Sequence, residues 1–322
     1  MEVTIFGLKL TLDPIAFTIP LGKNHWDVYW YGIIIALGFL LALVYGYKNA
    51  KRFNINTDKM LDVVIVTVPV AILCARAYYI IFDDQKITSI KEFFGFSSSG
   101  FSGLAIYGGV IGAYLTGSIM CKICKIHILD MFDLAAIGFL IGQGIGRWGN
   151  FVNQEAFGTF TNSSWWGMES QSTIDYMGSE GLVHPCFLYE SIWCLLGVFV
   201  LHYISKKRKF SGQIILTYCV WYGFERGFLE LIRTDSLMWG RIRISSLLSF
   251  TICISASVLL TIFLLQKRKL AKETVYSGMF LENSETEENI SENIEETLKE
   301  IKEETNDSEI TTTENEGECK ND

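Results

Sequence analysis

The sequence lacks the patterns of a secreted scaffold or a nucleotide-binding protein. Its first 28 residues have no basic start followed by an apolar core, so no cleavable signal peptide is expected. No P-loop glycine motif occurs, which argues against a nucleotide, and no nucleic-acid partner is expected. Cys121, Cys124 and His127 have no second ligand pair, so no metal is expected. The eight cysteines mostly lie within or beside apolar runs, which argues against a disulfide framework.

Long apolar runs dominate the chain instead. Half of its residues are hydrophobic, 14% are aromatic and the mean hydropathy is +0.28. A helix needs about 20 mostly apolar residues to cross the hydrocarbon layer of a bilayer. Seven segments are of that length and predict an all-α, polytopic membrane helix bundle: 28–47, 60–82, 104–120, 131–150, 186–204, 212–232 and 245–266.

Basic residues predict the orientation of this bundle. Lys and Arg follow the first, third, fifth and seventh segments, at 48–59, 122–125, 206–209 and 267–272, whereas 148–184 contains neither. Because cytoplasmic loops carry the excess of positive charge, we expect the N-terminus outside and the C-terminus in the cytoplasm. The same charges suit anionic headgroups, so anchoring at the surface and binding of membrane lipids both stay open.

The net charge of −8 arises at the C-terminal end of the chain. Residues 273–322 hold 17 acidic residues against 3 Lys, and the preceding part is net positive. Such an acidic segment, with almost no aromatics, predicts disorder, although Ile290, Ile294, Leu298 and Ile301 could form a marginal helix. The predicted division is an outer-face segment 1–27, a seven-helix transmembrane domain 28–266 with an outer-face insertion 151–185, and a disordered cytoplasmic tail 267–322.

Ionisable residues inside apolar segments are candidates for function, because a charge at membrane depth is costly and normally faces a cavity or a partner. Tyr222, Arg226, Glu230 and Arg233 are spaced by four, four and three residues, which puts them on one face of a helix. An Arg–Glu pair that merely closes the bundle would explain part of this face. A third cation from another segment, Arg147, favours a functional site. The other candidates at depth are Glu190 and Glu225 and, with less context, Arg76 and Asp133.

The fourth segment ends in a polar, glycine-rich stretch, G-I-G-R-W-G-N-F-V-N-Q-E at 144–155. Asn150, Asn153 and Glu155 supply polar groups at this helix end, which is typical of a headgroup site. Two or three arginines nearby suit a phosphate, since the guanidinium fork matches phosphate oxygens. A phospholipid is the phosphate most available at an outer membrane surface. Three glycines of the third segment are expected to serve helix packing instead: Gly108, Gly109 and Gly112.

Five motifs follow one another along the chain: W-Y-G at 30–32, G-L-A-I-Y-G-G at 103–109, G-R-W-G-N-F-V-N-Q-E-A-F-G at 146–158, H-P-C-F-L-Y-E at 184–190 and Y-G-F-E-R-G-F-L-E-L-I-R at 222–233. In order and position they resemble the prolipoprotein diacylglyceryl transferases of bacteria, over nearly the whole membrane body. The resemblance implies transfer of an sn-1,2-diacylglyceryl group from phosphatidylglycerol to the lipobox cysteine thiol of prolipoproteins. A thioether forms and glycerol phosphate leaves, at the outer face of the bacterial plasma membrane.

The resemblance also implies roles for residues at the matching positions. Arg147 and Arg226, with Arg233 beside them, would stabilise the charge that develops on the phosphate. Tyr107 stands where many family members have a histidine that is often assigned as the base, so the base is open here. A positive site could supply the thiolate without one. No metal or organic cofactor is implied. The other implied site residues are Tyr31, Asn150, Glu155, Gly158, Glu190, Tyr222 and Glu230.

Two other classes of protein stay open at this point. A secondary transporter of an anionic substrate would also place charges and broken glycine helices in the bundle, although the two halves show no internal repeat. A seven-span receptor or scaffold would use residues 148–184 as a ligand platform, but it leaves Arg147, Arg226 and Glu230 unexplained. Lipid-to-thiol transfer by the purified protein would separate an enzyme from both.

Deleting residues 273–322 is expected to leave transfer largely intact, because the acidic segment has no packing pattern and would lie across the membrane from the site. Transfer from labelled phosphatidylglycerol to a lipobox peptide measures this. Loss of transfer in a truncated protein that inserts at normal level would contradict the prediction.

Overall fold

The computed structural model describes residues 2–21, 24–82, 103–234, 238–239 and 242–270. The described residues up to 261 form one unit, and residues 262–270 belong to a second. The acidic segment 273–322, with its predicted disorder and its marginal helix, lies outside the described residues.

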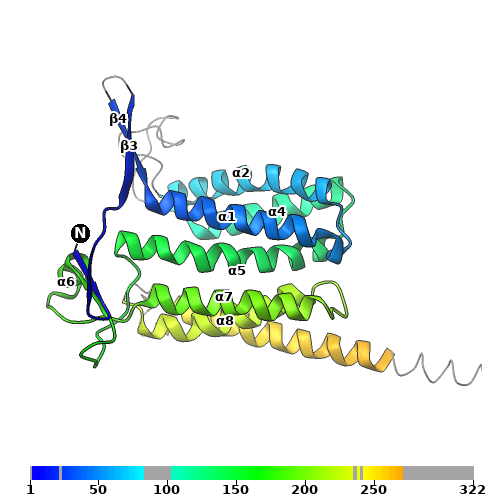
Figure 1. Ribbon diagram of the computed structural model, residues 1–322. Coiled ribbons are helices and arrows are strands. Elements are labelled where there is room, and N and C mark those ends of the chain that lie inside the picture. The colour runs from blue at the N-terminus through cyan, green and yellow to red at the C-terminus, as the bar shows by residue number, and fades with distance from the viewer. Residues whose placement is uncertain (1, 22–23, 83–102, 235–237, 240–241, 271–322) are drawn as a thin grey trace, which may run out of the picture. The chain divides into compact units, whose positions relative to one another are not determined.

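Seven long helices make up most of the described chain. Figure 1 shows the labelled long helices lying side by side, with the strands and the short helix α6 gathered at one end. This head end is where α1, α4 and α7 begin and where α2, α5 and α8 finish. The long helices are α1 (Trp30–Asn49), α2 (Thr57–Phe82), α4 (Ile106–Ile123), α5 (Ile128–Asn153), α7 (Cys186–Ser205), α8 (Gln213–Ile232) and a last helix, Ile244–Leu270.

The predicted membrane bundle is confirmed as a fold class. Six of the described helices are long and apolar enough to cross a membrane: α1 extended by the 3₁₀ turn η1 (Ala50–Phe53), α2, α4, α5, α7 and the last helix. Helix α8 has 20 residues, the same length as α7, but it carries Glu225, Arg226 and Glu230. All seven predicted segments coincide with these helices to within four residues at each end. Their orientation across the membrane stays a prediction.

Helices α2 and α4 approach each other at the glycines of α4. A Cβ atom built on Gly108 would lie 2.5 Å from the carbonyl oxygen of Cys74, and one on Gly112 would lie 2.5 Å from the Cβ of Cys74. Larger residues would therefore force the two helices apart. The prediction that these glycines serve packing is confirmed. Arg76 of α2 stabilises the same pair by donating to the carbonyl oxygen of Gly103 (2.9 Å).

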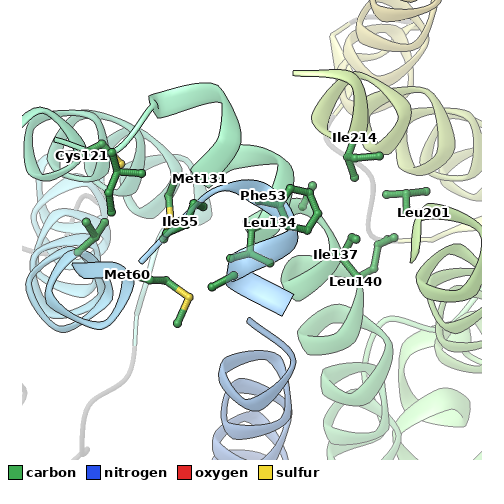
Figure 2. Close-up of a cluster of buried hydrophobic side chains, with 14 of the residues drawn as sticks. Phe53, Ile55, Met60, Cys121, Met131, Leu134, Ile137, Leu140, Leu201 and Ile214 are labelled. Carbon is green, nitrogen blue, oxygen red and sulfur yellow. The ribbon is translucent and has the colours of Figure 1, made fainter. Parts of the chain in front are cut away.

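The main apolar core lies toward the end of the bundle opposite the head. Phe53 of η1 and Leu134, Ile137 and Leu140 of α5 are almost completely buried there, and Leu201 of α7 joins them. Figure 2 shows these side chains pointing toward one another from several helices. Helix α5 is thus the central element, since it packs on α1 on one side and on α7 and α8 on the other.

A buried carboxylate fixes the start of α8 at this end. Asp133 of α5 accepts hydrogen bonds from the backbone amides of Gly212 (2.9 Å) and Ile215 (2.8 Å). Arg208 bridges Asp133 (2.9 Å) and Asp130 (2.7 Å). Asp133 therefore satisfies amides at a helix N-terminus and is itself paired, which accounts for this charge at depth.

Strands and loops at the head end connect the chain's N-terminal segment to the insertion after α5. Strand β1 (Glu2–Ile5) lies between β2 (Leu8–Thr11) and β5 (Met168–Ser170) in an antiparallel sheet. Val3, Met168 and Val183 are buried together with Phe151 and Phe187. The remaining described elements are β3 (Ile15–Leu21), β4 (Asn24–Tyr29), α6 (Gln171–Met177), β6 (Met238–Trp239) and β7 (Ile242–Arg243).

Candidate active site

Three arginines meet on one buried carboxylate at the head end of the bundle. Glu190, near the start of α7, has a side chain that is only 1% exposed. Its Oε2 pairs with Arg147 of α5, and its Oε1 lies 3.4 Å from Arg226 of α8 and 3.3 Å from Arg233, which follows α8. The structure thus brings together the cations that the sequence singled out. We call Arg147, Glu190, Arg226, Glu230 and Arg233 the arginine cluster.

Helix α8 contributes its own ion pair to the arginine cluster. Arg226 and Glu230, one turn apart, lie 2.9 Å from each other, and the Glu230 side chain is 3% exposed. Tyr222, one turn before Arg226, stacks on Tyr218 with a centroid distance of 5.7 Å and nearly parallel rings. The predicted polar face of this segment therefore exists, and it points into the bundle.

Exposure separates the three arginines. The side chains of Arg147 and Arg226 are 19% and 20% exposed, whereas that of Arg233 is 9% exposed. A guanidinium group has five N–H donors, so an arginine that pairs with one carboxylate can still donate to a second anion. Arg147 and Arg226 are consequently the two that an entering anion reaches most easily.

Polar groups from the end of α5 lie beside Arg147. Arg147 donates to the Oδ1 of Asn150 (3.4 Å), and the Nδ2 of Asn150 donates to the Oε1 of Glu155 (2.8 Å). Tyr31 of α1 packs its ring on Gly149, where a Cβ atom would lie 2.6 Å from that ring. Tyr31, Asn150 and Glu155 thus belong to the same end of the bundle as the arginine cluster.

Gly158 connects three elements around this site. Its amide donates to the carbonyl oxygen of His184 (3.0 Å), and the neighbouring Thr159 amide donates to that of Ile232 at the end of α8 (2.9 Å). A backbone bridge also pairs Gly158 with Arg233. Gly158 therefore positions the start of α7 and the end of α8, and its predicted role in substrate binding stays a prediction.

His184 extends this support toward the insertion. Its Nδ1 lies 3.1 Å from the hydroxyl of Tyr189, which accepts a hydrogen bond from the indole N–H of Trp166 (2.7 Å). Burial lowers the pKa of His184 below its usual value, so the imidazole is neutral near pH 7.

Tyr107 is placed apart from the arginine cluster. It lies in the first turn of α4, at the head end, and its side chain is 44% exposed. No hydrogen bond joins its hydroxyl to another residue of the described ranges. Helix α4 packs mainly on α2 and has few contacts with α5. Its predicted role in the site stays untested.

Two features of the site were missed from the sequence. Trp193 of α7 and Trp221 of α8 donate to each other's backbone carbonyl oxygens, both at 3.0 Å, and their rings stack. Arg243 of β7 donates to the carbonyl oxygens of Glu230 and Arg233 (3.3 Å to the latter) at the end of α8. Indole N–H donors and a cation near a helix C-terminus can be recognised in a sequence, but which backbone carbonyl each of them contacts depends on the folded arrangement.

Comparison with known proteins identifies the family. The family model described as prolipoprotein diacylglyceryl transferase matches residues 14–262. The chain belongs to the prolipoprotein diacylglyceryl transferase family. The resemblance drawn from the five motifs is therefore confirmed.

Relatives of this family match over most of their length. The phosphatidylglycerol–prolipoprotein diacylglyceryl transferase of Clostridioides difficile is 40% identical over 260 residues, which cover 80% of this chain and 98% of that protein. That of Bacillus cytotoxicus is 41% identical over 277 residues, covering 82% and 96%. That of Finegoldia magna is 42% identical over 250 residues, covering 77% and 94%.

Replacing Gly158 by alanine is expected to destabilise the head end. The added Cβ would lie 2.8 Å from the Cβ of His184, 2.9 Å from the Sγ of Cys186 and 3.0 Å from a methyl group of Ile232. Overpacking of this kind costs about 1–3 kcal/mol. Thermal unfolding in detergent measures it, with Gly142→Ala as the control because a Cβ there meets nothing within 4 Å. Equal midpoints for both variants would contradict the prediction.

Proposed function

We propose that this chain transfers the sn-1,2-diacylglyceryl group of phosphatidylglycerol to the cysteine thiol of prolipoproteins, releasing glycerol phosphate. The observation that carries the proposal is the convergence of Arg147 and Arg226 on Glu190. Two guanidinium groups that contact the same carboxylate lie close enough together to share one phosphate. The relatives named above carry this activity in their names, which supports a transferase over a transporter or a receptor.

The reaction needs positive charge at the phosphate. A thiolate sulfur attacks the glyceryl carbon that bears the phosphate ester, a C–S bond forms and the C–O bond breaks. The electron pair of that bond passes to a phosphate oxygen, so the phosphodiester monoanion becomes a phosphomonoester dianion. Donors already in place around this oxygen stabilise the charge as it develops, and a site with little water strengthens them.

Arg147 and Arg226 bind the phosphate in this proposal, because they are the more exposed arginines of the cluster. Arg233, Glu190 and Glu230 are almost completely buried and hold the two phosphate-binding arginines in position. Asn150 and Glu155 form the hydrogen-bonding pair beside Arg147 and suit the hydroxyl groups of the glycerol headgroup. Other contacts at this end come from Tyr31 and Tyr222, with Gly158 as backbone support.

Tyr107 orients substrate in this proposal. Its exposed position on α4 places it at the surface of the head end, where a lipid or peptide passes.

The site faces outward from the bacterial plasma membrane in this proposal. The basic residues Lys48, Lys51, Lys122 and Lys206 lie at the end of the bundle opposite the arginine cluster, and cytoplasmic ends carry such charge. A cysteine of an exported precursor, within a lipobox, would then meet phosphatidylglycerol of the outer leaflet.

Arg147→Ala and Arg226→Ala are each expected to lower transfer by about 10²–10³, the usual cost of removing one preorganised charge stabiliser. Lysine at either position should restore little, since an ammonium group cannot donate through a fork. The measurement is transfer from labelled phosphatidylglycerol to a lipobox peptide by purified protein.

Arg52→Ala is the matched control for this experiment, because Arg52 is exposed near the opposite end, where it donates to Ser205 (3.2 Å). Its transfer rate should stay near that of the wild type. Near-normal turnover in Arg147→Ala or Arg226→Ala would refute the phosphate-binding role of that residue. Absence of transfer by well-folded wild-type protein would refute the proposed function.

A further inference from the structure

Glu225 differs from the other two buried glutamates at the site. It lies on α8 immediately before Arg226 and is 9% exposed, yet neither of its carboxyl oxygens has a hydrogen-bond partner within the described ranges. Glu190 and Glu230, in contrast, pair with arginines. A buried carboxyl group without a donor is rare, because burial removes the water that would otherwise hydrogen-bond to it.

The packing of α7 on α8 places Glu225 beside Glu190. Trp221, one turn before Glu225, is fixed to Trp193 by their two reciprocal hydrogen bonds, and Arg226 reaches Glu190 one turn nearer the head end of α7. Residues one turn apart lie on the same face of a helix, so Glu225 follows Trp221 toward α7. Along the axis of α7, Glu225 therefore lies between Trp193 and Glu190.

The site holds equal numbers of cationic and acidic side chains. Arginines 147, 226, 233 and 243 face glutamates 155, 190, 225 and 230. A low-dielectric site resists any later change in its net charge, because unbalanced buried charge is expensive.

We propose that Glu225 accepts the proton that leaves the cysteine thiol; this inference rests on the proposed transferase function. The S–H bond breaks and the proton moves to a carboxylate oxygen of Glu225, while the sulfur bonds to the glyceryl carbon and the phosphate leaves with the C–O electron pair. The phosphate gains one negative charge as Glu225 loses one. The net charge of the site is therefore the same before and after the step, and the proton leaves with the product or to water afterwards.

Glu225 suits this task better than its neighbours do. Glu190 and Glu230 each contact arginines, whereas no hydrogen-bond donor of the described ranges occupies the carboxyl oxygens of Glu225. Where neighbouring carboxyl groups have such different surroundings, one can keep its charge and the other can take up and release a proton.

The groups around Glu225 come from each helix that packs on α8. They are Arg147 on α5, Glu190 and Cys194 on α7, Tyr222, Arg226 and Glu230 on α8 itself, Arg233 and Arg243 beyond α8, and Cys253 on the last helix, whose thiol donates to the carbonyl oxygen of Val220.

Glu225→Gln tests the proposal, because the amide keeps the shape of the carboxyl group and cannot take up a proton. Transfer to a cysteine peptide should fall by about 10²–10⁴, the usual scale of general-base catalysis. The residual rate should rise about tenfold per pH unit below the pKa of the free thiol, since only pre-ionised thiol then reacts. A selenocysteine peptide arrives already ionised at neutral pH, so its transfer by Glu225→Gln should lie within a few-fold of the wild-type rate.

Three further variants make the outcome decisive. Arg147→Ala should lose transfer to both peptides, because its defect lies at the phosphate, and Glu180→Gln, at an exposed position of the insertion, should lose neither. Glu225→Asp keeps a carboxyl group and should retain a selenocysteine-to-cysteine rate ratio near that of the wild type. This variant tests the proposal if the glutamine variant does not fold.

Normal cysteine transfer by Glu225→Gln, or equal losses with both peptides, would overturn the proposal. Failure of wild-type protein with both peptides would instead refute the transferase function.

Discussion

The carboxylate of Glu190 contacts arginines from two neighbouring helices and from the segment after α8, and the geometry of the site depends on it. With this side chain 1% exposed, its charge is stabilised almost entirely by Arg147, Arg226 and Arg233. Removing one partner of a buried ion pair costs about 3–5 kcal/mol, because the remaining charges stay buried. The same contact fixes the end of α5, the start of α7 and the end of α8 relative to one another.

Helix α8 is consequently held by charge at both of its ends. Asp133 accepts from amides in its first turn, and the arginine cluster, with Arg243, surrounds its last turn. Between these ends the reciprocal Trp193–Trp221 bonds join α8 to α7. Helix α8, which carries Glu225, Arg226 and Glu230, is thereby kept in one register, so that Arg226 stays on Glu190 together with Arg147.

The apolar periodicity was sufficient to predict the helices, because segments of about 20 apolar residues have few alternatives in a membrane. The spacing of Tyr222, Arg226, Glu230 and Arg233 was likewise sufficient to predict one polar face. Which partner each charge takes was not predictable, since Glu190 meets three arginines that are distant in sequence. Asp133 illustrates the same limit, because it accepts a hydrogen bond from a backbone amide at the start of α8 that is 79 residues away in the sequence. The short strands of the N-terminal segment pair with residues near 168, a register that depends on the folded insertion.

The position of the lipid phosphate tests the central claim most directly. We would determine an experimental structure of the protein in nanodiscs that contain phosphatidylglycerol, together with a lipobox peptide whose cysteine is replaced by alanine so that no transfer occurs. We expect phosphate oxygens within hydrogen-bond distance of both Arg147 and Arg226, with Glu190 still paired to Arg233. A phosphate bound elsewhere, with Arg147 and Arg226 both remaining on Glu190 alone, would contradict it.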